Sequence, residues 1–97
     1  MRHEILLSLE AVEDLKALKA NVRAAVKRAM ETHLRQEPQK LSRSRIKRLR
    51  GLQRPQYRLR VGETRIFYDV SGSTVEVLAI VTKSEAEKWL AQFGDPA

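Results

Sequence analysis

Three arginines between residues 57 and 70 have the spacing needed to present their side chains on one surface. Arg58 and Arg60 alternate with apolar residues, which is the period-two pattern of a half-buried strand, and Arg65 begins a second aromatic and β-branched run. Gly62-Glu63 separates the two runs and suits a type II′ turn, because glycine occupies its first central position. The segment therefore predicts a β-hairpin. Its expected cross-strand pairs are Val61 with Thr64, Arg60 with Arg65, Leu59 with Ile66 and Arg58 with Phe67.

In this register, one face of the hairpin is apolar and the other carries the three arginines. Arg60 then lies directly opposite Arg65, and like charges in that position repel by roughly 0.2–1 kcal/mol. An anion held between the guanidinium groups would remove this cost, and the forked geometry of guanidinium matches phosphate well. The residues also leave open a plainer alternative, a solvated polar face that is rich in arginine.

The segment before the hairpin extends the basic character. From Lys40 to Arg60 the chain has nine basic residues and no acidic residue. Tyr57 is the one aromatic residue there, so the composition indicates neutralisation of a nucleic-acid backbone more than stacking on bases. The candidate nucleic-acid contacts in the connection before the hairpin are Arg43, Arg45, Lys47, Arg48, Arg50 and Arg54.

The composition of the whole chain limits its size and its partners. With 97 residues and 42% apolar residues, residues 1–97 should form a single domain with one modest core. Lysine and arginine number 19 against 12 acidic residues, for a net charge of +7, which points to nucleic acid or a strongly acidic protein as partner.

Other functional classes receive little support from the sequence. The chain has no cysteine, hence no disulfide framework or thiolate chemistry, which suits a reducing compartment. His3 and His33 are too few to predict a metal site, and no cofactor is expected. No apolar run reaches the roughly 18 residues of a membrane span, and the N-terminus does not resemble a signal peptide. We therefore expect a cytoplasmic protein with no membrane contact and no small-molecule cofactor.

The N-terminal half predicts a strand followed by helices. Residues 2–7 form a short apolar run, and Ser8 is a suitable helix N-cap with acidic residues following it. Apolar residues at helical spacing then continue to Glu37-Pro38, where proline ends a helix. One long bent helix is possible, but we expect two antiparallel helices that meet at Asn21, because a single helix of this length would outgrow so small a sheet.

The C-terminal half predicts the remaining strands and one helix. Residues 40–55 lack sustained periodicity and predict a long, mostly irregular connection. After the hairpin, residues 74–81 form the most apolar run and predict a central strand. Ser84 and Glu87 have the spacing of a capping box for a last helix that runs from about Glu85 to Phe93.

The expected fold is α+β, in the order βααβββα, with a small, mainly antiparallel sheet. Two N-terminal helices cover one face of this sheet, and a helix closes the chain. The other face is expected to stay partly open, with the arginines above a floor of Phe67 and Leu78, so that it could receive a nucleic-acid strand. Packing roles are the default for Tyr57 and Tyr68 in the core and for Trp89 as the anchor of the last helix. Ser42 and Ser44 are expected to be loop residues.

Several of these segments together resemble a known family. The step Leu49-Arg50-Gly51-Leu52, the hairpin over residues 57–70 and the apolar strand over residues 75–81 are similar to the RelE/ParE superfamily of bacterial toxin–antitoxin toxins. The order and length of the helices also match, so the resemblance covers essentially the whole chain. It implies the RelE-like fold and an endoribonuclease that enters the ribosomal A site and cuts mRNA by attack of a 2′-hydroxyl on the adjacent phosphate.

The resemblance also implies roles for individual residues. Arg58 and Arg60 match the basic strand residues of the family, and Arg65 matches the arginine after the turn that contacts the phosphate. Lys83 lies near the place of a further catalytic arginine, so these four residues are the expected catalytic set, and the basic residues between 43 and 54 would bind RNA.

The chain departs from RelE-type nucleases at one position. Where a tyrosine, histidine or carboxylate near the C-terminus commonly helps in proton transfer, this chain has Trp89, which cannot transfer protons. Arginine is a poor general base because it stays protonated. The carboxylates that could approach the hairpin are Glu63, Asp69, Glu85 and Glu87, and the sequence does not choose among them.

Two further functions stay open at this point. ParE-like relatives share the fold and the hairpin pattern but poison DNA gyrase by binding, without nuclease chemistry. A plain RNA-binding module without a toxin role is the third possibility. Membership of a toxin family implies an antitoxin encoded nearby, and the basic surface implies that its binding segment is acidic and amphipathic.

Overall fold

The hairpin is the centre of the structure, a computed structural model that describes residues 2–97. Strand β4 (Tyr57–Val61) pairs with strand β5 (Thr64–Ser71) in the predicted register, with Arg60 opposite Arg65 and Arg58 opposite Phe67. Gly62 has a φ of +58° in the connecting turn, the left-handed region in which glycine avoids the steric penalty of a side chain. The predicted hairpin is therefore confirmed.

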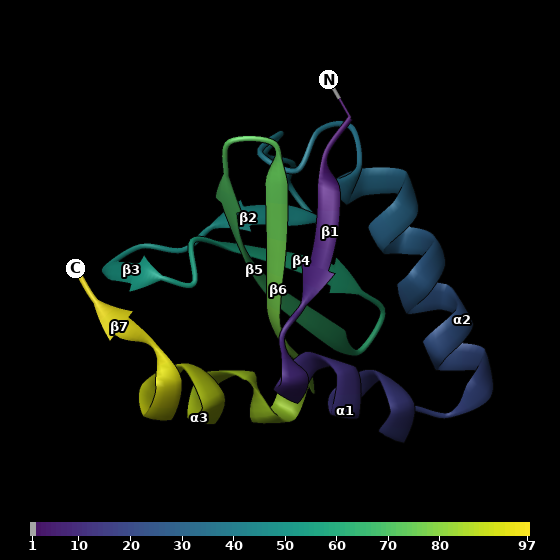
Figure 1. Cartoon of the computed structure of the whole chain (residues 1–97). Helices are drawn as coiled ribbons and strands as arrows, with labels where there is room; N and C mark the ends of the chain where they lie inside the picture. The colour runs from purple at the N-terminus through teal and green to yellow at the C-terminus, as the bar shows by residue number, and fades with distance from the viewer. Residues whose placement is uncertain (1) are drawn as a thin grey trace.

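The hairpin lies inside a five-stranded sheet of order β1-β6-β5-β4-β2 (Figure 1). Strand β6 (Thr74–Thr82) is an interior strand between β1 and β5, which agrees with its continuous hydrophobicity, and it runs antiparallel to β5. Strand β1 (Glu4–Leu7) pairs with β6 in parallel, and β2 (Ile46–Arg48) is antiparallel to β4. The sheet is thus mainly antiparallel, and the α+β class is confirmed.

Two N-terminal helices follow β1, as predicted, but they run crosswise to each other and are not the antiparallel pair that was expected (Figure 1). Helix α1 (Leu9–Ala17) begins at Ser8, whose Oγ accepts a hydrogen bond from the Ala11 N–H at 3.1 Å. Helix α2 (Ala20–Ala29) continues into the π-helical turn η1 (Met30–Leu34). The break lies at Leu18-Lys19, so the prediction of Asn21 was wrong by two to three residues. The Arg23 side chain fixes the break, because its Nη1 donates to the carbonyl oxygens of Lys16 at 3.1 Å and Leu18 at 2.9 Å.

The core forms between these helices and one face of the sheet. Val26, Met30 and Leu34 pack against a layer of strand residues, and burying each such side chain contributes roughly 1.5–3 kcal/mol. The strand residues of this layer are Ile46, Leu59, Ile66, Tyr68, Val75, Val77 and Ile80.

The two tyrosines confirm their predicted packing role. The rings of Tyr57 and Tyr68 stack with centroids 5.5 Å apart, and the Tyr68 hydroxyl donates to the Pro38 carbonyl at 2.6 Å. Burial raises the pKa of Tyr68, which therefore stays protonated.

The connection over residues 40–55 is mostly irregular, as predicted, but the prediction missed two short strands within it. It contains β2 and a second short strand, β3 (Leu52–Arg54), which pairs with the C-terminal strand β7 (Asp95–Pro96). The Ser42 Oγ accepts the N–H groups of Arg45 and Ile46, both at 3.0 Å, and so turns the chain into β2. Ile46 then enters the core beside Leu59. Strands of three residues carry too little periodicity to be recognised in a sequence.

Helix α3 (Lys83–Phe93) starts earlier than predicted, and Ser84 is not its cap. The N-cap is Thr82, whose Oγ1 donates a hydrogen bond to Glu85 Oε1 at 3.0 Å. This pair lies two residues before the capping box that was predicted at Ser84 and Glu87. The helix ends at Gly94, where the C-terminal segment turns back to β3 (Figure 1).

Helix α3 covers part of the face opposite the two N-terminal helices. The Trp89 ring stacks on Phe67 with centroids 5.2 Å apart, which agrees with the predicted anchor role, and Phe67 is only 1% exposed. Phe67 therefore cannot form an open floor for a nucleic acid, as the sequence had suggested, because the last helix lies over it. No helix within residues 2–97 is long and apolar enough to cross a membrane.

Candidate functional site

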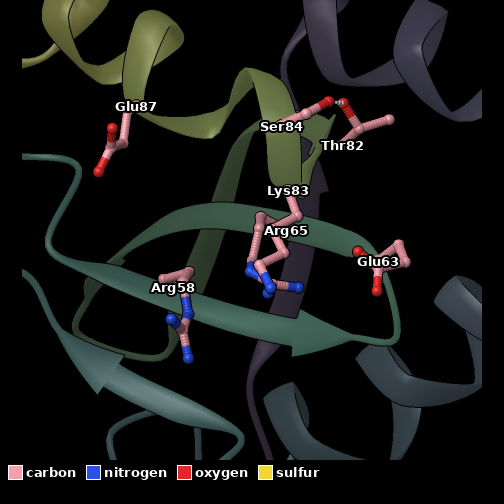
Figure 2. Close-up of a pocket in the computed structure, with 7 residues that line it drawn as sticks. All are labelled: Arg58, Glu63, Arg65, Thr82, Lys83, Ser84 and Glu87. Atoms are coloured by element: carbon pink, nitrogen blue, oxygen red, sulfur yellow. Dashed lines mark hydrogen bonds between the residues drawn. The ribbon is translucent and has the colours of Figure 1, made fainter.

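A basic groove of about 640 Å³ opens between the hairpin and the start of α3 (Figure 2). Four elements build it: strands β4 and β5 supply arginines, the end of β6 supplies a threonine, and the first turns of α3 supply the opposite wall. Three of the four predicted catalytic cations meet here. The lining residues are Arg58, Glu63, Arg65, Thr82, Lys83, Ser84 and Glu87.

Arg58 projects into the groove because strand alternation places it opposite the buried side chain of Leu59. Its Nε is buried and has no hydrogen-bond partner in the structure. Burial and the positive charges of Arg65 and Arg60 lower the pKa of Arg58. Leaving a buried donor unsatisfied costs roughly 1–3 kcal/mol, so the site is arranged at the expense of stability.

Arg65 is held more firmly than Arg58. It is 6% exposed, and its Nη1 donates to the carbonyl oxygens of Gly62 at 2.8 Å and Thr64 at 3.1 Å. These bonds use one nitrogen of a guanidinium that has five N–H donors, so the others remain for a ligand. A side chain fixed in this way loses little conformational entropy when it binds an anion.

Lys83 enters the groove from the opposite wall. It is the first residue of α3, and its backbone N–H donates to the Glu63 carbonyl at 2.7 Å. This backbone hydrogen bond connects the start of the helix to the hairpin turn. It therefore holds the Lys83 backbone close to the turn that precedes Arg65.

Arg60, the fourth predicted cation, does not line the groove. It lies opposite Arg65 in the sheet but is exposed. Lys47 occupies a comparable place, since it pairs with Arg58 across β2 and β4 and therefore shares the arginine-bearing face. Arg60 and Lys47 thus extend the positive surface beyond the groove along the sheet.

Glu63 and Glu87 line the groove, but neither forms an ion pair with its cations in residues 2–97. The ion pairs found within residues 2–97 join Arg35 to Glu31, Lys40 to Glu37, and Arg54 to Asp69 and Glu76. A protein with 12 acidic residues could have paired some of them with the groove. The free positive charge, together with the unsatisfied Nε of Arg58, matches the requirements of a phosphate-binding site.

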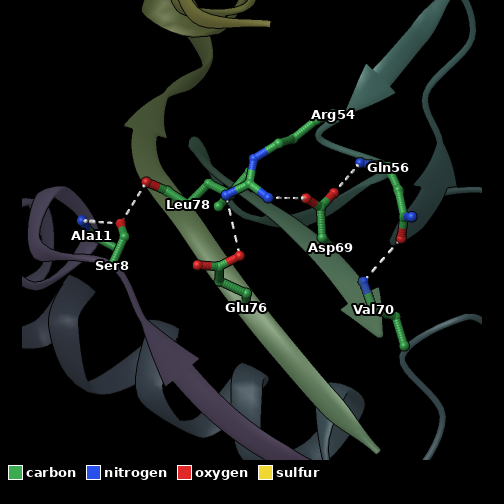
Figure 3. Close-up of polar contacts among 8 residues, drawn as sticks. All are labelled: Ser8, Ala11, Arg54, Gln56, Asp69, Val70, Glu76 and Leu78. Carbon is green, nitrogen blue, oxygen red and sulfur yellow. Dashed lines mark hydrogen bonds and ion pairs between the residues drawn. The ribbon is translucent and has the colours of Figure 1, made fainter. Parts of the chain in front are cut away.

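The residues predicted to bind RNA are placed in different ways. Arg43, Arg45, Arg48 and Arg50 are exposed, and the guanidinium of Arg48 lies over the Tyr57 ring, 5.1 Å from its centroid. Arg54 has a different environment, because its guanidinium pairs with Asp69 at 3.2 Å and Glu76 at 3.1 Å (Figure 3). The structure does not bring this set into the groove.

The Asp69 carboxylate has a structural role, because it binds both Arg54 and the backbone of Gln56. Its Oδ1 accepts the Gln56 N–H at 2.7 Å, and the Gln56 Oε1 accepts the Val70 N–H at 2.9 Å (Figure 3). Burial raises the pKa of Asp69, while the Gln56 N–H and Arg54 oppose this shift. This network fixes the start of β4 against β5 and leaves Asp69 outside the groove.

Of the candidate carboxylates, Glu63 and Glu87 line the groove and Glu85 does not. Trp89 has a structural environment, since its Nε1 donates to Glu10 Oε2 at 2.7 Å and its ring covers Phe67. The sequence reasoning did not identify Thr82 and Ser84 as groove residues. Thr82 lies beside the hairpin turn because it pairs with Thr64. This pairing could not be predicted from the sequence, since it depends on an irregularity in the register between β5 and β6.

The structure contains no obvious place for a metal ion. Within residues 2–97, no group of three or more histidine or acidic side chains is close enough to hold one.

Comparison with known proteins gives one family and a consistent fold. The model of the family described as ParE toxin of type II toxin-antitoxin system, parDE, matches residues 5–87. A chain of the RelBE2 toxin–antitoxin complex from Mycobacterium tuberculosis has a TM-score of 0.70 and 24% identity, with 84% of this chain and 99% of that chain covered. No curated protein matches the chain in sequence.

Two further solved structures have the same fold. A chain of the RelB-RelE antitoxin–toxin complex from Methanococcus jannaschii has a TM-score of 0.65 and 24% identity, with 87% of this chain and 96% of that chain covered. An arginine-to-alanine double mutant of the E. coli toxin RelE in the free state has a TM-score of 0.69 and 20% identity, with 92% of each chain covered. At these identities the likeness concerns the fold alone.

Proposed function

The chain belongs to the ParE family of toxins from type II toxin–antitoxin systems, within the RelE/ParE superfamily. From the cations that line its groove, we propose that it is a ribosome-dependent mRNA endoribonuclease. Cleavage of mRNA on ribosomes would place its action in the cytoplasm. The observation that carries this proposal is the groove itself, in which Arg58, Arg65 and Lys83 converge and none of the three forms an ion pair within residues 2–97.

The reaction needs positive charge more than any other group. The 2′-oxygen of a ribose forms a bond to the adjacent phosphorus while the bond from phosphorus to the 5′-oxygen breaks. The products are a 2′,3′-cyclic phosphate and a new 5′-hydroxyl. The transition state carries extra negative charge on the phosphoryl oxygens, and preorganised cations that stabilise it can contribute several kcal/mol, by the usual size of such effects.

The groove supports a division of roles among its cations. Arg58 and Arg65 face it from neighbouring strands and would bind the non-bridging oxygens of the scissile phosphate. Lys83 lies on the opposite wall, where its ammonium group would stabilise the leaving 5′-oxygen. Arg60 and Lys47, which lie outside the groove on the same face, would bind neighbouring phosphates of the strand.

Primer extension on a reporter mRNA tests this proposal in cells. Brief expression of the wild-type chain should produce discrete cleavages within translated codons, and the Arg60→Ala/Arg65→Ala double mutant should not. Arg28→Ala is the matched control, because Arg28 is exposed on α2 and lies outside the groove. Intact mRNA in the presence of folded wild-type protein would contradict the nuclease assignment, and intact mRNA in healthy cells would leave a binding module.

Binding to DNA gyrase without nuclease chemistry is the second candidate function. Two observations favour it: the matching family model is that of ParE, and Trp89 stands where proton transfer is commonly supported in RelE-type nucleases. A supercoiling assay with purified gyrase distinguishes the two functions. Inhibition of supercoiling, with intact mRNA and filamentous cells, would establish gyrase as the target.

An acidic antitoxin is the expected partner in either case. Two of the similar folds were solved as complexes of a toxin with its antitoxin. We propose that an acidic, amphipathic antitoxin segment covers the apolar groove of about 310 Å³ beside β1, whose walls include Ile5, Leu15 and Met30, and also brings carboxylates to the cationic groove. Its charge would complement the net charge of +7. Addition of the antitoxin should therefore abolish both toxicity and RNA binding.

A further inference from the structure

The cationic groove contains two carboxylates that phosphate binding alone does not explain. Glu63 lies in the hairpin turn and Glu87 in α3, and both line the same groove as Arg58, Arg65 and Lys83. A negative side chain in such a groove repels phosphate. If binding were the only task, a neutral residue would serve better at either position, so each of these carboxylates calls for a separate reason.

Glu87 is placed by the helix that forms the wall of the groove. It follows Lys83 by four residues, so the two side chains lie on the same face of α3, one turn apart. Figure 2 shows its carboxylate directed away from the helix on the side of the groove where Arg58 lies. Glu63 lies on the other side of Arg65, next to the turn. The two acids thus approach a phosphate held by Arg58 and Arg65 from different directions.

Glu87 is also free to accept a proton. Within residues 2–97, its carboxylate has no ion pair, whereas other acids near α3 are engaged. Glu85 accepts from Thr82, Glu10 accepts from Trp89, and Asp14 accepts the Ile80 N–H at 2.9 Å. Because a helix positions a side chain more accurately than a turn does, Glu87 is better placed than Glu63 for a proton transfer.

We propose that Glu87 is the general base of the mRNA cleavage, an inference that rests on the proposed nuclease function. The Glu87 carboxylate takes the proton of the 2′-hydroxyl as the 2′-oxygen bonds to phosphorus. The bond from phosphorus to the 5′-oxygen breaks, and that oxygen receives a proton from the Lys83 ammonium. Solvent then restores both side chains to their starting protonation states.

Single-turnover cleavage on purified ribosomes tests this role. Ribosomes carrying an mRNA with an empty A site are mixed with wild-type protein, Glu87→Gln or Glu63→Gln. The Glu63 variant is the matched control, since it makes the same change in the same groove. Glu87→Gln should lower the cleavage rate by roughly 10²–10⁴-fold, the usual contribution of a general base. Glu63→Gln should lower the rate far less than Glu87→Gln, and Glu87→Asp should retain part of the activity. Glu13→Gln, at an exposed residue of α1 outside the groove, should leave the rate unchanged.

Binding to an uncleavable substrate separates catalysis from structure. The probe is the same ribosome complex with a 2′-O-methyl group at the attacking ribose. Glu87→Gln should bind it as tightly as the wild type or more tightly, because a negative charge has left the groove. Equal cleavage by Glu87→Gln and wild type, an equal loss in Glu63→Gln, or a loss of binding that matches the loss of rate would overturn the assignment. If the wild type itself cleaves no mRNA, the proposed nuclease function is refuted, and the role of Glu87 falls with it.

Discussion

Replacement of Arg58 by methionine should stabilise the folded protein while it removes anion binding. The buried Nε of Arg58 has no partner, and such a group costs roughly 1–3 kcal/mol, with the lower end appropriate because the side chain is partly exposed. The like charge of Lys47, directly opposite, adds roughly 0.2–1 kcal/mol. Methionine keeps an unbranched stem that can fill the same space. We therefore expect a net gain of about 1–2 kcal/mol.

Thermal and urea unfolding at low ionic strength measure this gain. For a domain of this size, 1 kcal/mol corresponds to a shift in Tm of roughly 4–8 °C. The advantage of Arg58→Met should shrink in high salt, which screens the charge repulsion. Inorganic phosphate should stabilise the wild type more than the variant, because a ligand that binds the folded state raises its stability.

The control is Arg28→Met, which alters an exposed arginine on α2 and should respond to salt and phosphate like the wild type. A variant Arg58→Met that is less stable than the wild type, with an unchanged response to phosphate, would refute the reasoning. Arg58 would then be a structural residue and not part of an anion site.

Three further changes test other parts of the account. The scissile phosphate and the neighbouring phosphates held by Arg60 and Lys47 are three phosphate contacts. The logarithm of affinity for a single-stranded RNA should therefore fall with the logarithm of salt concentration with a slope of about −2.1. In fluorescence anisotropy titrations, Arg60→Gln should reduce the magnitude of this slope by about 0.7, and an unchanged slope would exclude Arg60. Gly62→Ala should lower the free energy of unfolding measured in urea by roughly 1–2 kcal/mol. Gly62 has a φ of +58° and no neighbour within 4 Å of an added Cβ, so backbone strain is the only expected cost. An equally stable variant would show that the turn relaxes. Burial raises the pKa of the Asp14 carboxyl above its ordinary value of 3.8, and the negative charges of Glu10 and Glu85 add to the shift. The folded state therefore binds the carboxyl proton more tightly than the unfolded state does. As a result, the contribution of Asp14 to stability falls as pH rises from 3.8 through the raised pKa. The stability of Asp14→Asn relative to wild type should therefore increase with pH across that window, and a constant difference would contradict this linkage.

The sequence predicted the elements in which a local pattern decides the structure. The hairpin register followed from the alternation around Arg58 and from the glycine that its turn requires, and the start of α1 followed from the capping chemistry of Ser8. The interior place of β6 followed from its hydrophobicity. Each of these features depends on residues that are close together in the chain.

The errors concern contacts between distant residues. The end of α1 is set by Arg23, which belongs to the next helix, and β3 exists because the C-terminal residues return to pair with it. The same reason explains the partial success at the site. The alternation in the hairpin predicted that Arg58 and Arg65 share a face. The stacking of Trp89 on Phe67 and the position of Glu87 in the groove depend instead on how α3 packs on the sheet.

The most direct test of the central claim uses one preparation of the purified protein in two assays. The first supplies ribosomes that carry an mRNA with an empty A site, and the second supplies gyrase with relaxed plasmid. The account predicts cleavage within the A-site codon, a 2′,3′-cyclic phosphate at the new 3′ end, loss of cleavage in Arg58→Ala, and no effect on supercoiling. Intact mRNA together with inhibited supercoiling would contradict it and identify the groove as part of a gyrase-binding surface.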